Sequence, residues 1–178
     1  IALPSNLVIE ATGPNGAAAS YTATAVDSVS GSLPVNYNVA PGMVFPVGTT
    51  EVTVLATDNA GNVGVGTFTV TVRDTTAPVF QSLSASPSVI AKPNGKMTPV
   101  VITANVADAV DTTPTTRIVS VTSNEGTSAD WQVTGDLTLN VRAERNNKGT
   151  GRVYTVTVES RDDAGNASTR NVTVTVPR

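Results

Sequence analysis

Apolar and polar residues alternate in short runs along the whole chain, which predicts β-strands separated by turns. Two of these runs share one pattern: residues 52–62 read VTVLATDNAGN and residues 156–166 read VTVESRDDAGN. A second alternating run follows each of them, over residues 67–72 and 171–176. Each pair of runs predicts a closing β-hairpin, so the chain contains an internal repeat.

The upstream parts of the repeat match less closely. A strand ending at Asp27 corresponds to one ending at Asp108, whereas the hairpins correspond at Asp58 and Asp162. The longer spacing in the second half predicts an insertion of about two strands between Asp108 and Asp162. This insertion would cover Trp131 and the glycine-rich turn that follows it.

The segment RDTTAP at residues 73–78 separates the two halves. Its proline lacks a backbone donor and restricts the residue before it to an extended conformation, which is typical of a short, stiff linker. We therefore predict an all-β protein made of two tandem immunoglobulin-like antiparallel β-sandwiches, over residues 1–76 and 77–178.

The composition argues against catalysis. The 178 residues include no cysteine and no histidine, so the chain has no disulfide, no thiolate metal site and no histidine base. Residues 1–76 carry five acidic residues and one basic residue, which argues against nucleic-acid binding. No apolar run is long enough to span a bilayer, so we expect no membrane insertion. We predict that the protein is not an enzyme.

The first half resembles a hyalin repeat (HYR) domain in FPVGTT at residues 45–50, DNAGN at 58–62 and DTTAP at 74–78. The second half resembles a related immunoglobulin-like module of bacterial secreted proteins, in residues 92–97, 117–125 and 139–145. Members of that group often carry a cysteine pair, which this chain lacks. The resemblance implies an extracellular, secreted or cell-surface, adhesion or spacer role and no catalytic residues.

Several aspartates end strands whose alternate residues are apolar. Asp27 follows Ala23 and Ala25 at this spacing, and Asp58 follows Val54 and Ala56. In an immunoglobulin-like topology the two strands would deliver these carboxylates to one end of the module.

Carboxylates that lie close together repel each other unless a cation or hydrogen-bond donors offset their charge, and Ca²⁺ accepts six to eight oxygen ligands. One hypothesis is therefore calcium at the junction of the modules, similar to cadherin interdomain sites, with a second site in the first module. Its ligands would be Asp74, Asp108, Asp111, Asp162 and Asp163 at the junction, and Asp27 and Asp58 in the first module. The alternative is that these aspartates only stabilise their own turns.

Two other features have both a structural and a functional interpretation. Trp131 could stack on a sugar ring, but a single tryptophan in a Val- and Thr-rich module is more typical of the core. The basic residues around the tip at 142–152 could meet an anionic polysaccharide or lipid headgroup. We favour a solvated hairpin that discourages edge-to-edge pairing.

The predicted function is a non-catalytic structural or adhesion spacer within a larger secreted or cell-surface protein. Its partners would be neighbouring domains of the parent chain, and a cell-surface protein or glycan is a further candidate. We expect the isolated chain to be a monomer. The alternative function is a carbohydrate-binding accessory module of an extracellular polysaccharide-degrading enzyme.

Overall fold

The computed structural model describes residues 1–178 and divides them into two compact units, Ile1–Thr75 (unit 1) and Thr76–Arg178 (unit 2). Both consist of β-strands, and the one helical element is a three-residue 3₁₀ turn, η1 (Ser128–Asp130). The all-β prediction is confirmed. No helix is long and apolar enough to cross a membrane.

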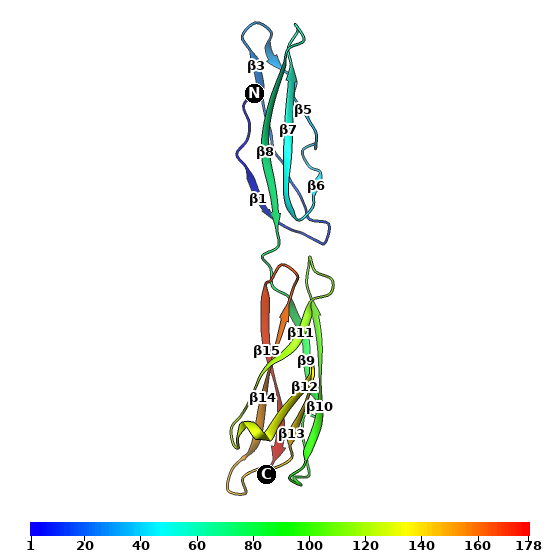
Figure 1. Ribbon diagram of the computed structural model, residues 1–178, viewed down its shortest axis with the longest axis vertical. Coiled ribbons are helices and arrows are strands. Elements are labelled where there is room, and N and C mark those ends of the chain that lie inside the picture. Colours follow the sequence, from blue (N-terminus) through cyan, green and yellow to red (C-terminus); the bar gives the residue numbers. More distant parts are fainter. The chain divides into compact units, whose positions relative to one another are not determined.

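Unit 1 contains one four-stranded sheet, in the order β1-β8-β7-β5, and two short strand pairs, β2-β6 and β3-β4 (Figure 1). Its strands are β1 (Leu7–Glu10), β2 (Ala17–Ala18), β3 (Ala25–Asp27), β4 (Gly31–Leu33), β5 (Asn36–Tyr37), β6 (Val44–Phe45), β7 (Gly48–Thr57) and β8 (Val63–Arg73). The first strand of the sheet, β1, and the last strand of the unit, β8, run parallel, with Leu7 opposite Val70 and Glu10 opposite Arg73.

The predicted alternation of buried residues is confirmed in unit 1. Val52, Val54 and Val70 are fully buried, and Tyr21 packs edge-on against Phe68 with ring centroids 5.0 Å apart. This buried face extends through alternate residues from Ala17 to Ala25. Ile9 is only partly buried, because it lies on the edge strand β1.

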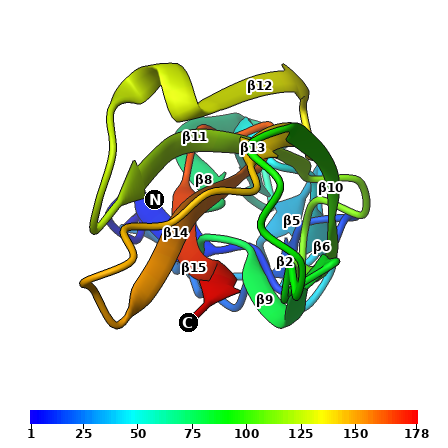
Figure 2. The same ribbon diagram turned by 90° about the horizontal axis from the view of Figure 1, so that it is seen from below.

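Unit 2 contains a four-stranded sheet, β12-β13-β10-β9, and a three-stranded sheet, β11-β14-β15, and Figure 2 labels the strands of both in an end-on view. Its strands are β9 (Val79–Ser86), β10 (Met97–Ala107), β11 (Thr115–Ser123), β12 (Trp131–Gly135), β13 (Thr138–Arg142), β14 (Gly151–Arg161) and β15 (Ala167–Pro177).

On both sides of unit 2, backbone hydrogen bonds connect the three-stranded sheet to segments that flank strands of the four-stranded sheet. On one side the amide of Ile90 donates to Thr175 O at 2.8 Å, and the amide of Thr175 donates to Ser88 O at 2.9 Å. On the other side the amide of Ile118 donates to Asp136 O at 2.7 Å. The outer edges of β15 and β11 are therefore partly covered, which limits edge-to-edge association.

The core of unit 2 is one cluster of buried residues that includes Leu139, Tyr154, Val156 and Val174. Trp131 and Val172 pack against this cluster but are only partly buried. Val106 is also only partly buried, because a β-bulge between Asn105 and Val106 interrupts the pairing of β10 with β9.

The expected insertion of two strands in the second half is wrong. Four strands, β4 to β7, lie between Asp27 and Asp58, and four, β11 to β14, lie between Asp108 and Asp162. The extra residues lengthen strands instead: β11 has nine residues where β4 has three. Residue spacing alone does not distinguish an added strand from a longer one.

Candidate functional site

The two strand-ending aspartates of unit 1 lie at one end of it, as predicted. Asp27 and Asp58 line the same pocket, together with Ile1, and we call this end the entry pole of unit 1. The amides of Val29 and Ser30 donate to Asp27 Oδ1 at 2.9 and 2.7 Å. These bonds lower the pKa of Asp27 from its ordinary value, because they favour the charged carboxylate.

Asp58 holds the neighbouring turn in the same way. Its Oδ1 accepts the amides of Ala60 and Asn62 at 2.9 and 2.8 Å, and its Oδ2 accepts the Asn62 side-chain amide at 2.7 Å. Hydrogen bonds from Asn62 lower the pKa of Asp58, whereas the charge of Asp27 acts in the opposite direction. The two carboxylates are therefore close enough to repel each other.

Unit 2 repeats this arrangement at its own entry pole, formed by the turns at residues 108–113 and 162–166. Asp108 Oδ1 accepts the amides of Val110 and Asp111 at 2.8 and 2.9 Å. Asp162 is 5% exposed and holds Asn166 through both carboxylate oxygens.

A further bond ties the two turns of this pole together: the Asp163 amide donates to Asp111 Oδ2 at 3.0 Å. The structure therefore brings Asp111 to the 162–166 turn, and both strand-ending aspartates stabilise turns.

Calcium fits these residues only in part. Asp108 Oδ2 is a buried oxygen without a hydrogen-bond partner, which is the kind of acceptor that a cation could satisfy. However, no group of three or more acidic side chains lies close enough to hold a metal ion. The hypothesis also needs Asp74, which belongs to unit 1 and has interactions of its own. Calcium at the junction therefore stays a prediction.

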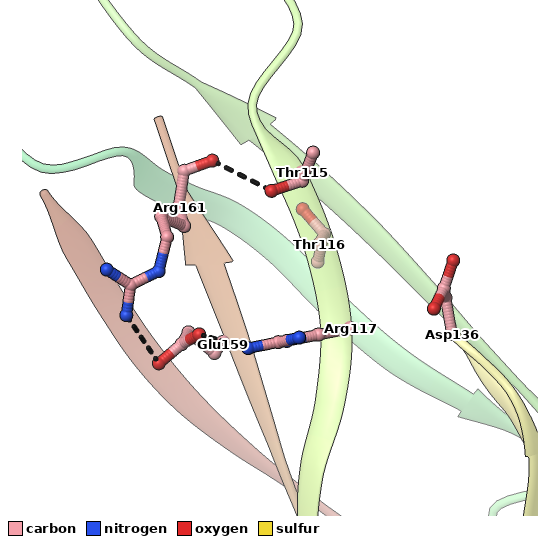
Figure 3. Close-up of a pocket in the computed structure, with 6 residues that line it drawn as sticks. All are labelled: Thr115, Thr116, Arg117, Asp136, Glu159 and Arg161. Atoms are coloured by element: carbon pink, nitrogen blue, oxygen red, sulfur yellow. Dashed lines mark hydrogen bonds and ion pairs between the residues drawn. The ribbon is translucent and has the colours of Figure 1, made fainter. Parts of the chain in front are cut away.

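A polar groove of about 440 Å³ lies on unit 2 where β11 and β14 meet the β12–β13 turn. Figure 3 shows its lining side chains: Thr115, Thr116, Arg117, Asp136, Glu159 and Arg161. Glu159 lies between two cations, 3.5 Å from Arg117 Nη2 and 3.4 Å from Arg161 Nη2. Arg161 also donates to Gly165 O at 2.9 Å, which connects the groove to the entry pole.

Charged and hydroxyl side chains line this groove. Its two arginines and two acids balance, and the arginines are 62% and 46% exposed, so their ion pairs contribute little to stability. None of its lining side chains is aromatic. Its threonine hydroxyls have no histidine base to activate them, since the chain contains none. The amino-acid sequence did not predict this groove, because only the strand register reveals that Arg117 lies opposite Glu159.

The basic hairpin at 142–152 is not simply solvated, which corrects the prediction. Arg152 is 6% exposed and pairs with Asp130 Oδ2 at 3.1 Å. Arg142 Nε lies 2.8 Å from Asp130 Oδ1. Tyr154 OH accepts a bond from Arg152 at 3.0 Å and donates to Arg142 O at 2.9 Å. Arg152 faces inward because it has the same strand parity as the buried Tyr154 and Val156.

Trp131 belongs to the same region of unit 2. Its ring meets Tyr154 edge-on at 6.2 Å and packs against the core cluster. This position favours the core interpretation over sugar stacking, which needs an open ring face.

The first half of the chain matches a family model. The HYR domain model matches residues 2–72. Hyalin of Lytechinus variegatus is 32% identical over 153 residues, which is 86% of this chain and 25% of hyalin. An "Uncharacterized 81.3 kDa protein" of Acholeplasma phage L2 is 31% identical over 158 residues, which is 88% of this chain and 18% of that protein. The chain thus spans a quarter or less of these relatives.

Solved structures of low sequence identity also align with the chain. Human protocadherin-24 EC1-2 aligns at a TM-score of 0.39 and 17% identity, covering 96% of this chain and 93% of that one. Fibronectin(III)-like modules of Clostridium thermocellum CbhA align at 0.35 and 15%, covering 97% and 90%. The assignment of the second half to a bacterial immunoglobulin-like module stays a prediction. The match over residues 2–72 and the similarity to hyalin support a HYR domain in the first half of the chain.

Proposed function

We propose that the chain is a pair of immunoglobulin-like sandwich modules that act as a load-bearing, non-catalytic spacer in an extracellular adhesion protein. The HYR domain and the similarity to hyalin support an extracellular adhesion role. The spacer role is supported by one structural observation, which is how an N-terminal segment of each unit is joined to its last strand.

In both units the entering and leaving segments run parallel and bond to each other. In unit 1, β1 pairs with β8 over four positions, and the Ala11 amide donates to Arg73 O at 2.7 Å. In unit 2, Val89 lies opposite Thr175 in a parallel bridge with hydrogen bonds on both sides. Tension on the two ends of a unit therefore pulls these strands past each other and loads all their hydrogen bonds at once.

This geometry resists force better than the peeling of an antiparallel hairpin, in which the bonds break one after another. A spacer between a surface and a binding domain needs this property, whereas a catalytic or sugar-binding module does not. The absence of histidine and cysteine and the balanced charges of the groove are consistent with a non-catalytic module.

Calcium at the junction of the two modules belongs to the same proposal. Its support is the unpartnered Asp108 Oδ2 and the four aspartates in the two turns of the entry pole of unit 2. A cation bound there together with Asp74 would restrict the linker, as a spacer of defined geometry requires.

Force spectroscopy tests the spacer role. The chain is pulled between handles fused to its two ends, and unit 1 is expected to unfold in a single high-force event. Ala11→Pro removes the 2.7 Å bond to Arg73 O at the end of the parallel patch and should lower the unfolding force. Ala2→Pro is the matched control, because it removes a 2.7 Å bond to Thr24 O outside the patch.

The two variants should differ. Equal unfolding forces for wild type and Ala11→Pro, with the fold retained by circular dichroism, would contradict a load-bearing role. Binding to a glycan array that disappears in a folded Trp131→Ala variant would instead favour the carbohydrate-binding alternative.

A further inference from the structure

The outer surface of the three-stranded sheet of unit 2 carries polar side chains in rows. Apart from the bulged Val119 in β11, residues that face the core alternate along each strand with residues that face away from it. The strand register places the outward residues side by side in rows that cross the sheet. Three successive rows are Thr122–Thr155–Thr173, Ser120–Thr157–Asn171 and Arg117–Glu159–Thr169.

The neutral side chains of these rows are available to a ligand. None of their hydroxyl and amide groups forms a hydrogen bond within the protein. The rows through Thr155 and Glu159 are four residues apart along β14, a distance of about 13 Å. A ligand that covers all three rows is therefore longer than one sugar ring and rich in hydrogen-bonding groups.

This face offers little to a ligand that binds through apolar or stacking contacts. Trp131 and Tyr154 belong to the core region of unit 2, and Phe80 lies on β9 of the other sheet. Sugar stacking needs an open aromatic ring, and the rows contain none. Recognition on this face therefore depends on hydrogen bonds and charge.

The polar groove of about 440 Å³ lies at the charged end of the face (Figure 3). Arg117 donates one bond, to Glu159, and Arg161 donates two, to Glu159 and to Gly165 O. Each guanidinium group therefore keeps N–H donors that no protein group accepts. Two guanidinium groups beside one carboxylate leave a net positive charge, so this cluster can bind a further carboxylate from a ligand.

Two features prepare the groove for such a ligand. The bond to Gly165 O ties Arg161 to the 162–166 turn, which Asp162 stabilises, so its guanidinium is held in place before a ligand arrives. On the other side of β11, the Asp136 side chain forms no hydrogen bond or ion pair (Figure 3). Its carboxylate can accept hydrogen bonds from hydroxyl groups.

These observations favour one class of ligand. A neutral saccharide lacks the anion that the two arginines would bind, and an acidic peptide lacks the hydroxyl groups that match the neutral rows. A chain of uronic acid residues has a carboxylate and several hydroxyl groups on every ring, so it supplies both.

We propose that the outer face of the three-stranded sheet of unit 2 binds a carboxylated polysaccharide. Arg117 and Arg161 bind one carboxylate, and the rows through Thr155 and Thr157 bind the hydroxyl groups of the neighbouring rings. The proposal does not rest on the load-bearing role, because force spectroscopy measures unit 1 and this site belongs to unit 2. Either one can fail without the other.

Isothermal titration calorimetry of the whole chain at low salt tests the site. The probes are hexasaccharides of galacturonate, mannuronate and hyaluronan, and chelator is present throughout so that calcium cannot bridge a uronate to the aspartates. At least one of the three is expected to bind. High salt should weaken its binding about tenfold, because it screens exposed charges. No heat of binding with any of the three would overturn the proposal.

Three further ligands separate the contributions of charge and of hydroxyl groups. The methyl ester of the saccharide that binds, neutral cellohexaose and a hexamer of glutamate should each bind at least tenfold more weakly. Equal binding of the methyl ester would show that the arginines are not involved. Equal binding of the glutamate hexamer would show that the face recognises charge alone, and either result contradicts the proposal.

Variants locate the site on the protein. Arg117→Gln with Arg161→Gln should weaken binding of the saccharide at least tenfold, because the carboxylate loses its charged donors. The matched control, Lys96→Gln with Lys148→Gln, removes two exposed positive charges elsewhere on unit 2 and should bind like wild type. Equal losses in the two variants would reduce the effect to net charge and overturn the assignment to the groove.

A second pair of variants tests the neutral rows. Thr155→Val with Thr173→Val removes two outward hydroxyl groups and should weaken binding of the hexasaccharide about tenfold. Thr67→Val with Thr69→Val makes the same change on β8 of unit 1 and should bind like wild type. Unchanged binding by the first variant would contradict the proposal that the chain lies across the rows. Thermal unfolding of every variant confirms that it is folded.

Discussion

Arg152 Nη1 lies 3.1 Å from Asp130 Oδ2, and this ion pair joins the start of β14 to η1 in the interior of unit 2. The Arg152 side chain is 7% exposed and that of Asp130 is 14% exposed. Asp130 also binds Arg142, so one carboxylate compensates two guanidinium groups. Removing it leaves a buried cation without its counter-charge.

We therefore expect Asp130→Asn to destabilise unit 2 by about 3 kcal/mol, as is typical when one partner of a buried ion pair is removed. Urea unfolding followed by circular dichroism measures the change. Glu159→Gln is the control, because Glu159 pairs only with the exposed Arg117 and Arg161, and it should cost less than about 1 kcal/mol. Equal losses for the two variants would show that burial of Arg152 is not the cause.

The same carboxylate makes the stability of unit 2 depend on pH. The Thr127 amide and the Arg142 and Arg152 guanidinium groups lower the pKa of Asp130 from its ordinary 3.8. A group with a lowered pKa in the folded state adds stability above its unfolded pKa and loses it as the pH falls through the folded value. The melting temperature of the wild type should therefore fall more steeply below about pH 4 than that of Asp130→Asn. Parallel curves would contradict this assignment.

The fold was predictable where residues alternate over long strands. The runs around Val54 and Val156 gave the hairpins, and strand parity placed Asp27 and Asp58 at one pole, because side-chain direction follows from position in a strand. Pairing between distant strands was not predictable. The bond from Ile118 to Asp136 and the pair Arg117–Glu159 depend on a register that local sequence does not determine.

The burial of charged side chains was the least predictable feature of the structure. Arg152 is basic and close to a glycine-rich turn, which is typical of a solvated loop. Its burial follows from strand parity and from the presence of Asp130, which is 22 residues away in the sequence. A buried cation can be recognised from sequence only when its partner is also identified.

The side chains of neighbouring residues in a strand face opposite sides, and this alternation can be tested in unit 1. Val70 is fully buried, whereas its neighbour Thr71 shares a 3.0 Å bond with Thr49 on the outer face. Val70→Asp should unfold unit 1, because it buries an unpaired charge. Thr71→Asp should cost less than about 1 kcal/mol. Circular dichroism and thermal unfolding compare the two, and a folded Val70→Asp variant would show that the core is placed wrongly.

Gly16 is the glycine at which a side chain meets the backbone most directly. Its φ is +100°, and an added Cβ would lie 1.8 Å from Phe45 O. Gly16→Ala should therefore separate β2 from β6 and destabilise unit 1 by more than about 3 kcal/mol. Gly61 is the control, since its φ is +89° with no atom within 4 Å of an added Cβ, so Gly61→Ala should cost only about 1–2 kcal/mol of backbone strain. Urea unfolding measures both.

Calcium binding at the junction is tested by thermal unfolding of the whole chain with millimolar calcium and with chelator. At about 100 times its dissociation constant, calcium should stabilise the unit that holds the site by roughly 2.7 kcal/mol. Asp74→Ala should remove much of this gain without unfolding either unit, because Asp74 follows β8 and lies outside both cores.

Two further variants separate calcium binding from turn stabilisation. Asp108→Asn keeps Oδ1 as an acceptor for the Val110 and Asp111 amides but replaces the buried, unpartnered Oδ2 with an amide nitrogen that cannot ligate a cation. It should abolish the calcium response. Asp136→Asn, on the β12–β13 turn, should leave that response unchanged. A melting temperature that is the same with calcium and with chelator would leave the aspartates as turn residues alone, because their own amides already satisfy most of their oxygens.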